Sequence, residues 1–275
     1  MTLQVGPAWL FCPADRPERF AKAAAVADVV ILDLEDGVAA SDKEGARRAV
    51  VESALDPTKT VVRINPTDTA DCHADLEALE RTGYTAVMLP KCESAQQVSA
   101  LAPRQVIVLI ETPLGAVKVA ESVQADNAVG VMWGSEDLFA ALGGTANRNP
   151  DGTLRDVARQ VRSASLLAAK AYSRLALDSV YLDIKDLDGL RAEVDDAVAV
   201  GFDVKVAIHP SQVPVIRAGY APAADQVDWA HRVLAAARDR RGVFELDGMM
   251  VDMPVLRRAQ HIIRLSEHSH GTGSR

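Results

Sequence analysis

Cysteine is scarce in this sequence of 275 residues, which contains only Cys12, Cys72 and Cys92. The number is odd, the spacing is wide, and neither a CxxC pair nor a histidine at ligand spacing accompanies them. This pattern argues against a disulfide framework and against a zinc site. We therefore expect the three cysteines to pack in the core.

Long basic runs and long apolar runs are missing as well. No run of Lys and Arg reaches five and the formal net charge is −8, so we expect no nucleic-acid-binding face. No segment has the roughly eighteen uninterrupted apolar residues that a membrane helix needs. The first residues, MTLQVGPAWLFCPADRP, have neither a basic start nor a long apolar region. We expect a cytoplasmic protein that is neither exported nor inserted into a membrane.

Apolar residues, by contrast, make up 48% of the chain and occur in short runs. Eight of these runs have the length of a strand and are separated by segments with helical periodicity. Eight strands that alternate with helices are typical of a closed parallel barrel, and an open doubly wound sheet is the alternative fold. The predicted strands are residues 9–13, 29–36, 60–65, 86–91, 106–112, 129–137, 179–183 and 204–210.

No linker rich in Pro, Gly or Ser interrupts the first 210 residues. We predict an α/β fold with a (β/α)8 TIM-barrel core over residues 1–210, a C-terminal helical extension over residues 211–267 and a flexible tail over residues 268–275. The extension is longer than one closing helix requires and contains two predicted helices, 223–240 and 254–265. It is available to cover an active site, on the same subunit or on a neighbouring one.

Two predicted strands end in a carboxylate close to a glycine or proline. Glu111 and Asp137 are 26 residues apart, about the length of one strand, loop, helix and loop. The two carboxylates should therefore lie at the same ends of adjacent parallel strands, where two hard oxygen ligands suit Mg²⁺. The alternative is that Glu111 caps the helix that starts at Pro113 and that Asp137 accepts hydrogen bonds from backbone N–H groups.

Charged side chains also end other predicted strands, and in TIM barrels these strand ends form the active face. Arg63 can stabilise a developing enolate oxygen there, or it can form a structural ion pair with Glu35 or Asp36. Alternation along the strand sends Asp33 and Glu35 to the face opposite Asp36, so only some of the three acids touch substrate. We assign Asp36 to substrate binding.

Three further side chains of this face have alternative roles. Arg16 opens the first predicted helix and is expected to meet anionic groups of the ligand. Lys91 raises the alternative of a Schiff-base aldolase, because a desolvated lysine becomes nucleophilic, but it can also pair with Glu111 or another acid. His209 can act as a general base, and a histidine hydrogen-bonded at the barrel rim is the simpler explanation.

The chain carries, in this order, VILDLEDGV, VVRIN, LPK, LIETPLG, GSEDL, YLDIKDLDGL, GFDVKVAIHPSQV and LDGMMVDMPV. With these motifs it resembles the citrate lyase β-subunit-like (CitE-like) branch of the HpcH/HpaI aldolase and malyl-CoA lyase family. The resemblance extends from about residue 9 to residue 265. It implies a Mg²⁺-dependent TIM barrel that cleaves or forms the C–C bond of a β-hydroxyacyl-CoA thioester and assembles as a homotrimer or hexamer.

Residue by residue, the resemblance implies roles for five side chains. Glu111 and Asp137 match the metal ligands, Arg63 matches the arginine beside the substrate oxygen, and Arg16 matches an arginine that holds the ligand. In related lyases the aspartate of a GxMVD motif comes from a neighbouring subunit and acts as the acid/base. In this sequence that aspartate is Asp252.

The expected reaction starts with removal of the substrate hydroxyl proton near Asp252 and ends with protonation of an acyl-CoA enolate. Arg63, the metal and the backbone N–H groups of Gly134 and Ser135 are expected to stabilise that enolate. A CoA-independent class II pyruvate-type aldolase is one alternative, and a non-catalytic CoA-ester-binding accessory subunit is another. The acyl group stays open among citramalyl, malyl, citryl and 3-hydroxy-3-methylglutaryl thioesters.

Overall fold

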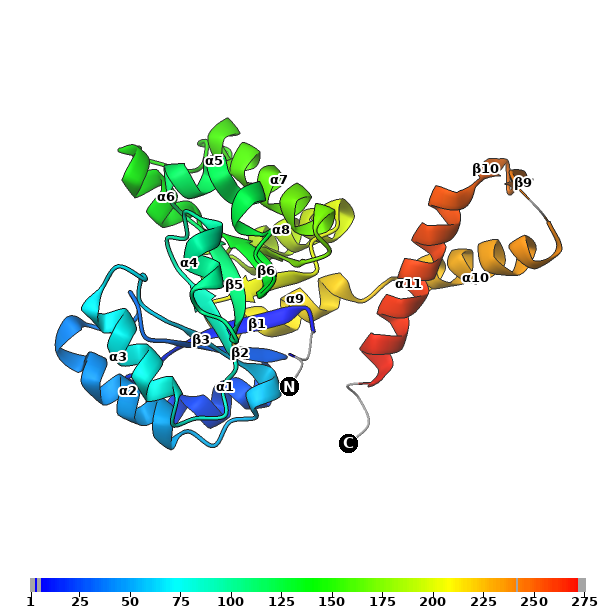
Figure 1. Ribbon diagram of the computed structural model, residues 1–275. Coiled ribbons are helices and arrows are strands. Elements are labelled where there is room, and N and C mark those ends of the chain that lie inside the picture. Colours follow the sequence, from blue (N-terminus) through cyan, green and yellow to red (C-terminus); the bar gives the residue numbers. More distant parts are fainter. Residues whose placement is uncertain (1–2, 4–5, 241, 272–275) are drawn as a thin grey trace. The chain divides into compact units, whose positions relative to one another are not determined.

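Eight parallel strands close into a barrel in the structure, a computed structural model that describes residues 3, 6–240 and 242–271. Each strand pairs with the next in sequence, and β1 pairs with β8 to close the barrel. Figure 1 shows the helices around the strands. The predicted (β/α)8 barrel is confirmed. Its strands are β1 Ala8–Pro13, β2 Val29–Asp33, β3 Thr60–Arg63, β4 Ala86–Leu89, β5 Gln105–Ile110, β6 Ala128–Trp133, β7 Leu175–Asp178 and β8 Val204–Ala207.

Four of the eight α-helices of the barrel, α3, α4, α5 and α8, begin at a side chain that accepts a hydrogen bond from the first turn. Thr69, Ser94, Thr112 and Asp186 each accept a backbone N–H in this way. The α-helices are α1 Phe20–Val26, α2 Lys43–Glu52, α3 Ala70–Leu79, α4 Ala95–Ser99, α5 Pro113–Ser122, α6 Ser135–Leu142, α7 Asp156–Ala171 and α8 Leu187–Val200, and the 3-10 turns are η1 Pro17–Arg19, η2 Ala40–Asp42 and η3 Pro57–Lys59.

Two sequence predictions about strands are wrong. Residues 179–183 have no regular structure, and the seventh strand is β7, which precedes them. Its last residue, Asp178, is a buried acid that ends the apolar run in the sequence. The sixth strand ends at Trp133, and Asp137 lies instead in the first turn of α6, a helix that the sequence analysis did not predict.

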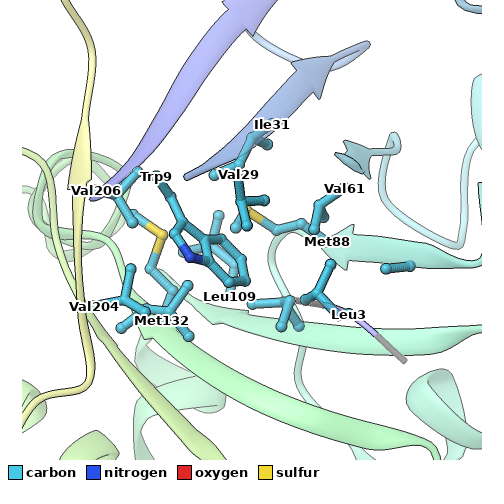
Figure 2. Close-up of a cluster of buried hydrophobic side chains, with 13 residues drawn as sticks. Leu3, Trp9, Val29, Ile31, Val61, Met88, Leu109, Met132, Val204 and Val206 are labelled. Atoms are coloured by element: carbon cyan, nitrogen blue, oxygen red, sulfur yellow. The ribbon is translucent and has the colours of Figure 1, made fainter. Parts of the chain in front are cut away.

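Inward-facing strand residues fill the barrel with one apolar cluster. In Figure 2 the indole of Trp9 lies near its centre, close to Met132, Val204 and Val206. Complete burial of one Val, Leu, Ile or Met side chain stabilises the folded state by about 1.5–3 kcal/mol relative to leaving it exposed. This packing fixes the strand register and so brings the carboxyl ends of the strands to one edge. The three cysteines are free and buried, as predicted.

Residues 217–275 form a second compact unit, separate from the unit of residues 1–216. It consists of α10 Ala224–Asp239, the hairpin of β9 Phe244–Leu246 and β10 Met249–Val251, and α11 Met253–Gly271. Its own core is made by Ala230, Val233, Val251, Ala259 and Ile262. Helix α9, Gln212–Tyr220, spans the boundary between the two units.

Helix α11 extends to Gly271 and so includes residues 268–271 of the predicted tail. The rest of that tail, residues 272–275, lies outside the described residues. Among the helices of the described residues, none has the length and apolar character needed to cross a membrane.

Outward-facing side chains of β7 and β8 form a buried ion cluster with α7 and α8. Lys205 Nζ lies 3.1 Å from Asp178 Oδ2 and 2.9 Å from Glu193 Oε2. Arg162 Nε and Trp133 Nε1 donate to Asp178 Oδ1 at 3.0 and 2.7 Å. Burial alone would raise the pKa of Asp178, but Lys205 and Arg162 outweigh burial and lower it. The carboxylate is therefore charged in the folded protein.

The substitution Asp178→Asn tests this cluster. It leaves Lys205 buried without one of its two carboxylates, so we expect the free energy of unfolding at pH 7 to fall by about 3–5 kcal/mol. Because folding lowers the pKa of Asp178, its contribution is present above the unfolded pKa, near 4, and is lost as the pH falls below it. Urea denaturation at pH 7 and pH 3 measures both effects.

The control is Asp195→Asn, a change of an exposed acid on α8 that should alter the free energy of unfolding by no more than about 0.5 kcal/mol. If Asp178→Asn behaves like this control, the buried cluster does not stabilise the barrel.

Candidate active site

Charged side chains gather at the edge formed by the carboxyl ends of the strands, which we call the carboxyl rim. Contacts link them into one network that starts on β2 and β3, where Asp33 is paired with Arg63 in the sheet. The members of the carboxyl rim that carry the argument are Asp33, Glu35, Asp36, Arg63, Lys91, Glu111 and Asp137.

Arg63 is held by two acids of the strand beside it. Its Nε and Nη2 donate to the two oxygens of Asp33 at 2.7 and 2.6 Å, and its Nη1 lies 3.0 Å from Glu35 Oε2. Burial alone would lower the pKa of Arg63, but the charges of Asp33 and Glu35 raise it. The alternative of an ion pair with Glu35 is confirmed, and the second partner is Asp33 instead of Asp36. Three contacts leave two of the five guanidinium N–H donors for a ligand.

Lys91 contacts three acids. Its ammonium contacts Glu35 and lies 3.1 Å from Asp36 Oδ2 and 3.7 Å from Asp137 Oδ1. Burial alone would lower the pKa of Lys91, but Glu35 and the other acids raise it. A protonated amine is not a nucleophile, so the structure supports the ion-pair alternative and not the Schiff base. Lys91 also has φ 50°, a left-handed backbone conformation that costs a non-glycine residue about 1–3 kcal/mol and that clusters at active sites.

Glu111 directly follows β5 and is only 3% exposed. Its Oε1 accepts a hydrogen bond from the backbone N–H of Lys91 at 3.0 Å. Thr112, and not Glu111, caps α5 by accepting from the N–H of Gly115, so the helix-cap alternative for Glu111 is wrong. Asp137 lies in the first turn of α6, where its Oδ1 is 3.7 Å from Lys91 Nζ.

The environment of Glu111 suits a cation. Burial and, to a smaller extent, the charges of Asp137 and Glu35 raise the pKa of Glu111 to about 8. The five acids of the carboxyl rim outnumber its two cations, Arg63 and Lys91, and a divalent ion would offset the excess negative charge. A Cβ at Gly134 would lie 2.9 Å from Glu111 Oε2, so glycine there keeps the carboxylate uncrowded.

Glu111 and Asp137 therefore fit a Mg²⁺ ion, which takes one or two protein carboxylates and fills its other positions with waters or substrate oxygens. No cluster of three or more His, Cys, Asp or Glu ligands occurs in the described part of the chain. Such a closed ligand set is typical of a structural ion, whereas two carboxylates leave room for a substrate.

Three other residues of the barrel, Arg16, Gly134 and Ser135, were also predicted to contact the ligand. Arg16 lies in the loop after β1 with an exposed side chain, and its Nε is 3.6 Å from Asp15 Oδ2. The N–H of Gly134 donates to the carbonyl of Ile110 at 2.8 Å, so the prediction that it stabilises an enolate is wrong. Ser135 is the first residue of α6, and the N–H of a first helical residue has no acceptor within its own helix.

His209 and Trp133 have structural partners. The Nδ1 of His209 is 2.8 Å from Ser211 Oγ, as the simpler explanation predicts. The indole of Trp133 is buried against Asp178.

Asp252 belongs to the C-terminal unit, where it precedes α11. Its Oδ1 accepts from the N–H of Val255 at 3.2 Å and so caps that helix.

Sequence reasoning missed Asp33 as a partner of Arg63, although alternation had placed Asp33 and Glu35 on one face. It also missed the contact between Lys91 and Asp137, which no local pattern signals.

Comparisons with known proteins agree with this geometry. The HpcH/HpaI aldolase/citrate lyase family matches residues 8–210. A citrate lyase subunit beta-like protein of Mycobacterium tuberculosis is 62% identical over 259 residues, which cover 94% of this chain and 95% of the relative. Mitochondrial citramalyl-CoA lyase of Homo sapiens is 30% identical over 291 residues, which cover 94% of this chain and 84% of the relative.

A solved structure also matches this chain in both sequence and fold. The crystal structure of CitE from Mycobacterium tuberculosis in complex with magnesium, acetoacetate and coenzyme A has a TM-score of 0.92 at 62% identity, over 96% of this chain and 98% of that chain. The sequence match, the fold match and the two carboxylates of the carboxyl rim agree. The chain belongs to the HpcH/HpaI aldolase/citrate lyase family.

Proposed function

We propose that this protein is a Mg²⁺-dependent carbon–carbon lyase that acts on a β-hydroxyacyl-CoA thioester and yields an acyl-CoA and a keto acid. The observation that carries the proposal is the pair Glu111 and Asp137 beside the charged Arg63, on the carboxyl rim of a barrel of this family. The similar CitE structure holds magnesium, acetoacetate and coenzyme A, and the human relative is named a citramalyl-CoA lyase. Both observations support the proposal.

When bound by Glu111 and Asp137, Mg²⁺ would supply a Lewis acid for the carboxylate and hydroxyl oxygens of the substrate. Arg63 holds a positive charge where the enolate oxygen develops. Because Asp33 and Glu35 already fix its guanidinium, no reorganisation is needed during the reaction. The N–H of Ser135 offers a second donor at the start of α6.

The remaining roles concern the proton and the anionic ligand groups. Asp252 takes the hydroxyl proton as general base in the cleavage direction. The exposed Arg16 binds an anionic group of the ligand, and the exposed Asp36 contacts a polar one. An intact set of these residues argues against an accessory subunit that has lost turnover.

We further propose a homotrimer or hexamer in which the C-terminal unit supplies Asp252 to a neighbouring subunit. Met249, Met250 and Met253 flank Asp252 and are 55%, 66% and 59% exposed. Clustered exposed apolar side chains of this kind mark surfaces that bind another molecule. A subunit interface would bury them around the carboxylate.

Mass spectrometry of the purified protein with Mg²⁺ and a panel of citramalyl-, malyl-, citryl- and 3-hydroxy-3-methylglutaryl-CoA tests the activity. We expect one thioester to yield an acyl-CoA and a keto acid, and we expect Glu111→Gln to lower the rate at least about 100-fold. Cleavage of free hydroxy acids without CoA would favour the class II aldolase instead. If neither the CoA thioesters nor the free hydroxy acids are cleaved, the result would favour a non-catalytic accessory subunit.

A substitution at Asp252 tests the general base. Asp252→Asn keeps an acceptor for the α11 cap, whereas Asp252→Ala would also cost about 0.5–2 kcal/mol of cap energy. We expect Asp252→Asn to lower kcat about 10²–10⁴-fold with little change in thioester affinity. Glu245→Gln, an exposed change in β9 of the same unit, is the matched control.

Mixed oligomers test whether Asp252 acts on a neighbour. Coexpression of Asp252→Asn chains with Glu111→Gln chains should restore part of the activity, because some sites then combine an intact Glu111 with an intact Asp252. No recovery in mixed oligomers would contradict the exchange of Asp252 between subunits.

A further inference from the structure

A polar cluster outside the barrel ties together the ends of β2 and β3, the strands that carry Asp33 and Arg63. Lys43, the first residue of α2, donates to the carbonyls of Leu34 and Glu35 at 2.8 and 3.1 Å and to Asn65 Oδ1 at 2.7 Å. An ammonium group has three N–H donors, and here each has an acceptor. Lys43 therefore uses all three N–H donors on groups that follow β2 and β3.

Asn65 completes this connection from the side of β3. Its Nδ2 donates to the carbonyl of Leu34 at 2.9 Å and to Asp75 Oδ2 at 2.7 Å. Asn65 is 5% exposed and Asp75 is fully buried, so these bonds are shielded from water. The carbonyl of Leu34 thus accepts from both Lys43 and Asn65.

The segment of residues 34–38 is also held by its own N–H groups, and the N–H of Leu34 donates to the carbonyl of Arg63 at 2.9 Å. The N–H groups of Glu35, Asp36 and Gly37 donate to carboxylate oxygens of Asp33 and Glu35 at 2.9, 3.1 and 3.0 Å. The same two carboxylates hold Arg63. A shift of the backbone at residues 34 and 35 would therefore move the groups that hold Arg63 and Lys91.

We propose that Lys43 is a positioning residue of the active site, an inference that rests on the proposed lyase function. It fixes the backbone of Leu34 and Glu35 so that the Glu35 carboxylate contacts Arg63 and Lys91 at the same time. Lys43 itself contacts neither the predicted metal ligands nor the groups assigned to substrate. Lys43 therefore affects the reaction by positioning Glu35.

Arg47 provides a matched control on the same helix. Its Nε donates to Asp75 Oδ1 at 2.7 Å, and its Nη2 donates to Asp71 Oδ1 at 2.5 Å. It belongs to the same cluster, but its bonds join α2 to α3 and not to residues 34 and 35. If the cluster served stability alone, substitution of Arg47 would affect the protein at least as much as substitution of Lys43.

The test compares Lys43→Met and Arg47→Lys with the wild-type chain by hydrogen-exchange mass spectrometry, thermal denaturation and steady-state kinetics. Methionine has nearly the length of lysine, so the first change removes the ammonium and little packing. We expect Lys43→Met to speed amide exchange in residues 34–38 at least tenfold and to lower kcat at least tenfold, with KM changed less than threefold. Arg47→Lys should lower Tm by more than Lys43→Met does, with exchange at residues 34–38 and kcat close to wild type.

Unchanged exchange at residues 34–38 in Lys43→Met would overturn the proposal, because exchange reports the backbone and needs no substrate. Faster exchange with a wild-type kcat would also overturn it, since the segment would then be free to move without consequence for the reaction. A wild-type chain without lyase activity would refute the proposed function instead, and the exchange result would still show whether Lys43 holds residues 34–38.

Discussion

Charge balance at the carboxyl rim is the constraint on which the candidate site depends. Five acids share two cations there, and several of these groups are buried, where an unpaired charge is costly. Arg63 and Lys91 satisfy Asp33, Glu35 and Asp36 and leave Glu111 and Asp137 with weak compensation. Burial and this excess of acids together raise the pKa of Glu111, and the excess makes the place attractive to a divalent cation.

The fold supplies the positions at which these charges meet. Parallel strands in register bring residues that are far apart in the sequence to one edge, as the pairing of Ile110 with Trp133 does for Glu111 and Gly134. Small residues keep the edge open, since side chains at Gly134 and Gly37 would collide with Glu111 and Asp33. The apolar interior holds the strands rigidly, so the site is organised before any ligand binds.

The sequence predicts the elements whose signals are local and misses those that depend on distant partners. Runs of apolar residues locate most strands, but β7 ends in Asp178, an acid that is tolerated only because Lys205 and Arg162 neutralise it. Alternation predicts that Asp33 and Glu35 share a face, yet it does not say which cation they bind. The contacts of Lys43 with backbone carbonyls leave no trace in the sequence, because a carbonyl is present at every residue.

Titration of the purified chain with Mg²⁺ by isothermal calorimetry tests whether Glu111 and Asp137 bind the ion. We expect one ion per chain for the wild type and at least tenfold weaker binding for both Glu111→Gln and Asp137→Asn. Glu136→Gln, in the same first turn of α6, should bind as the wild type does. A wild type that binds no Mg²⁺, or variants of Glu111 and Asp137 that bind it unchanged, would contradict the account.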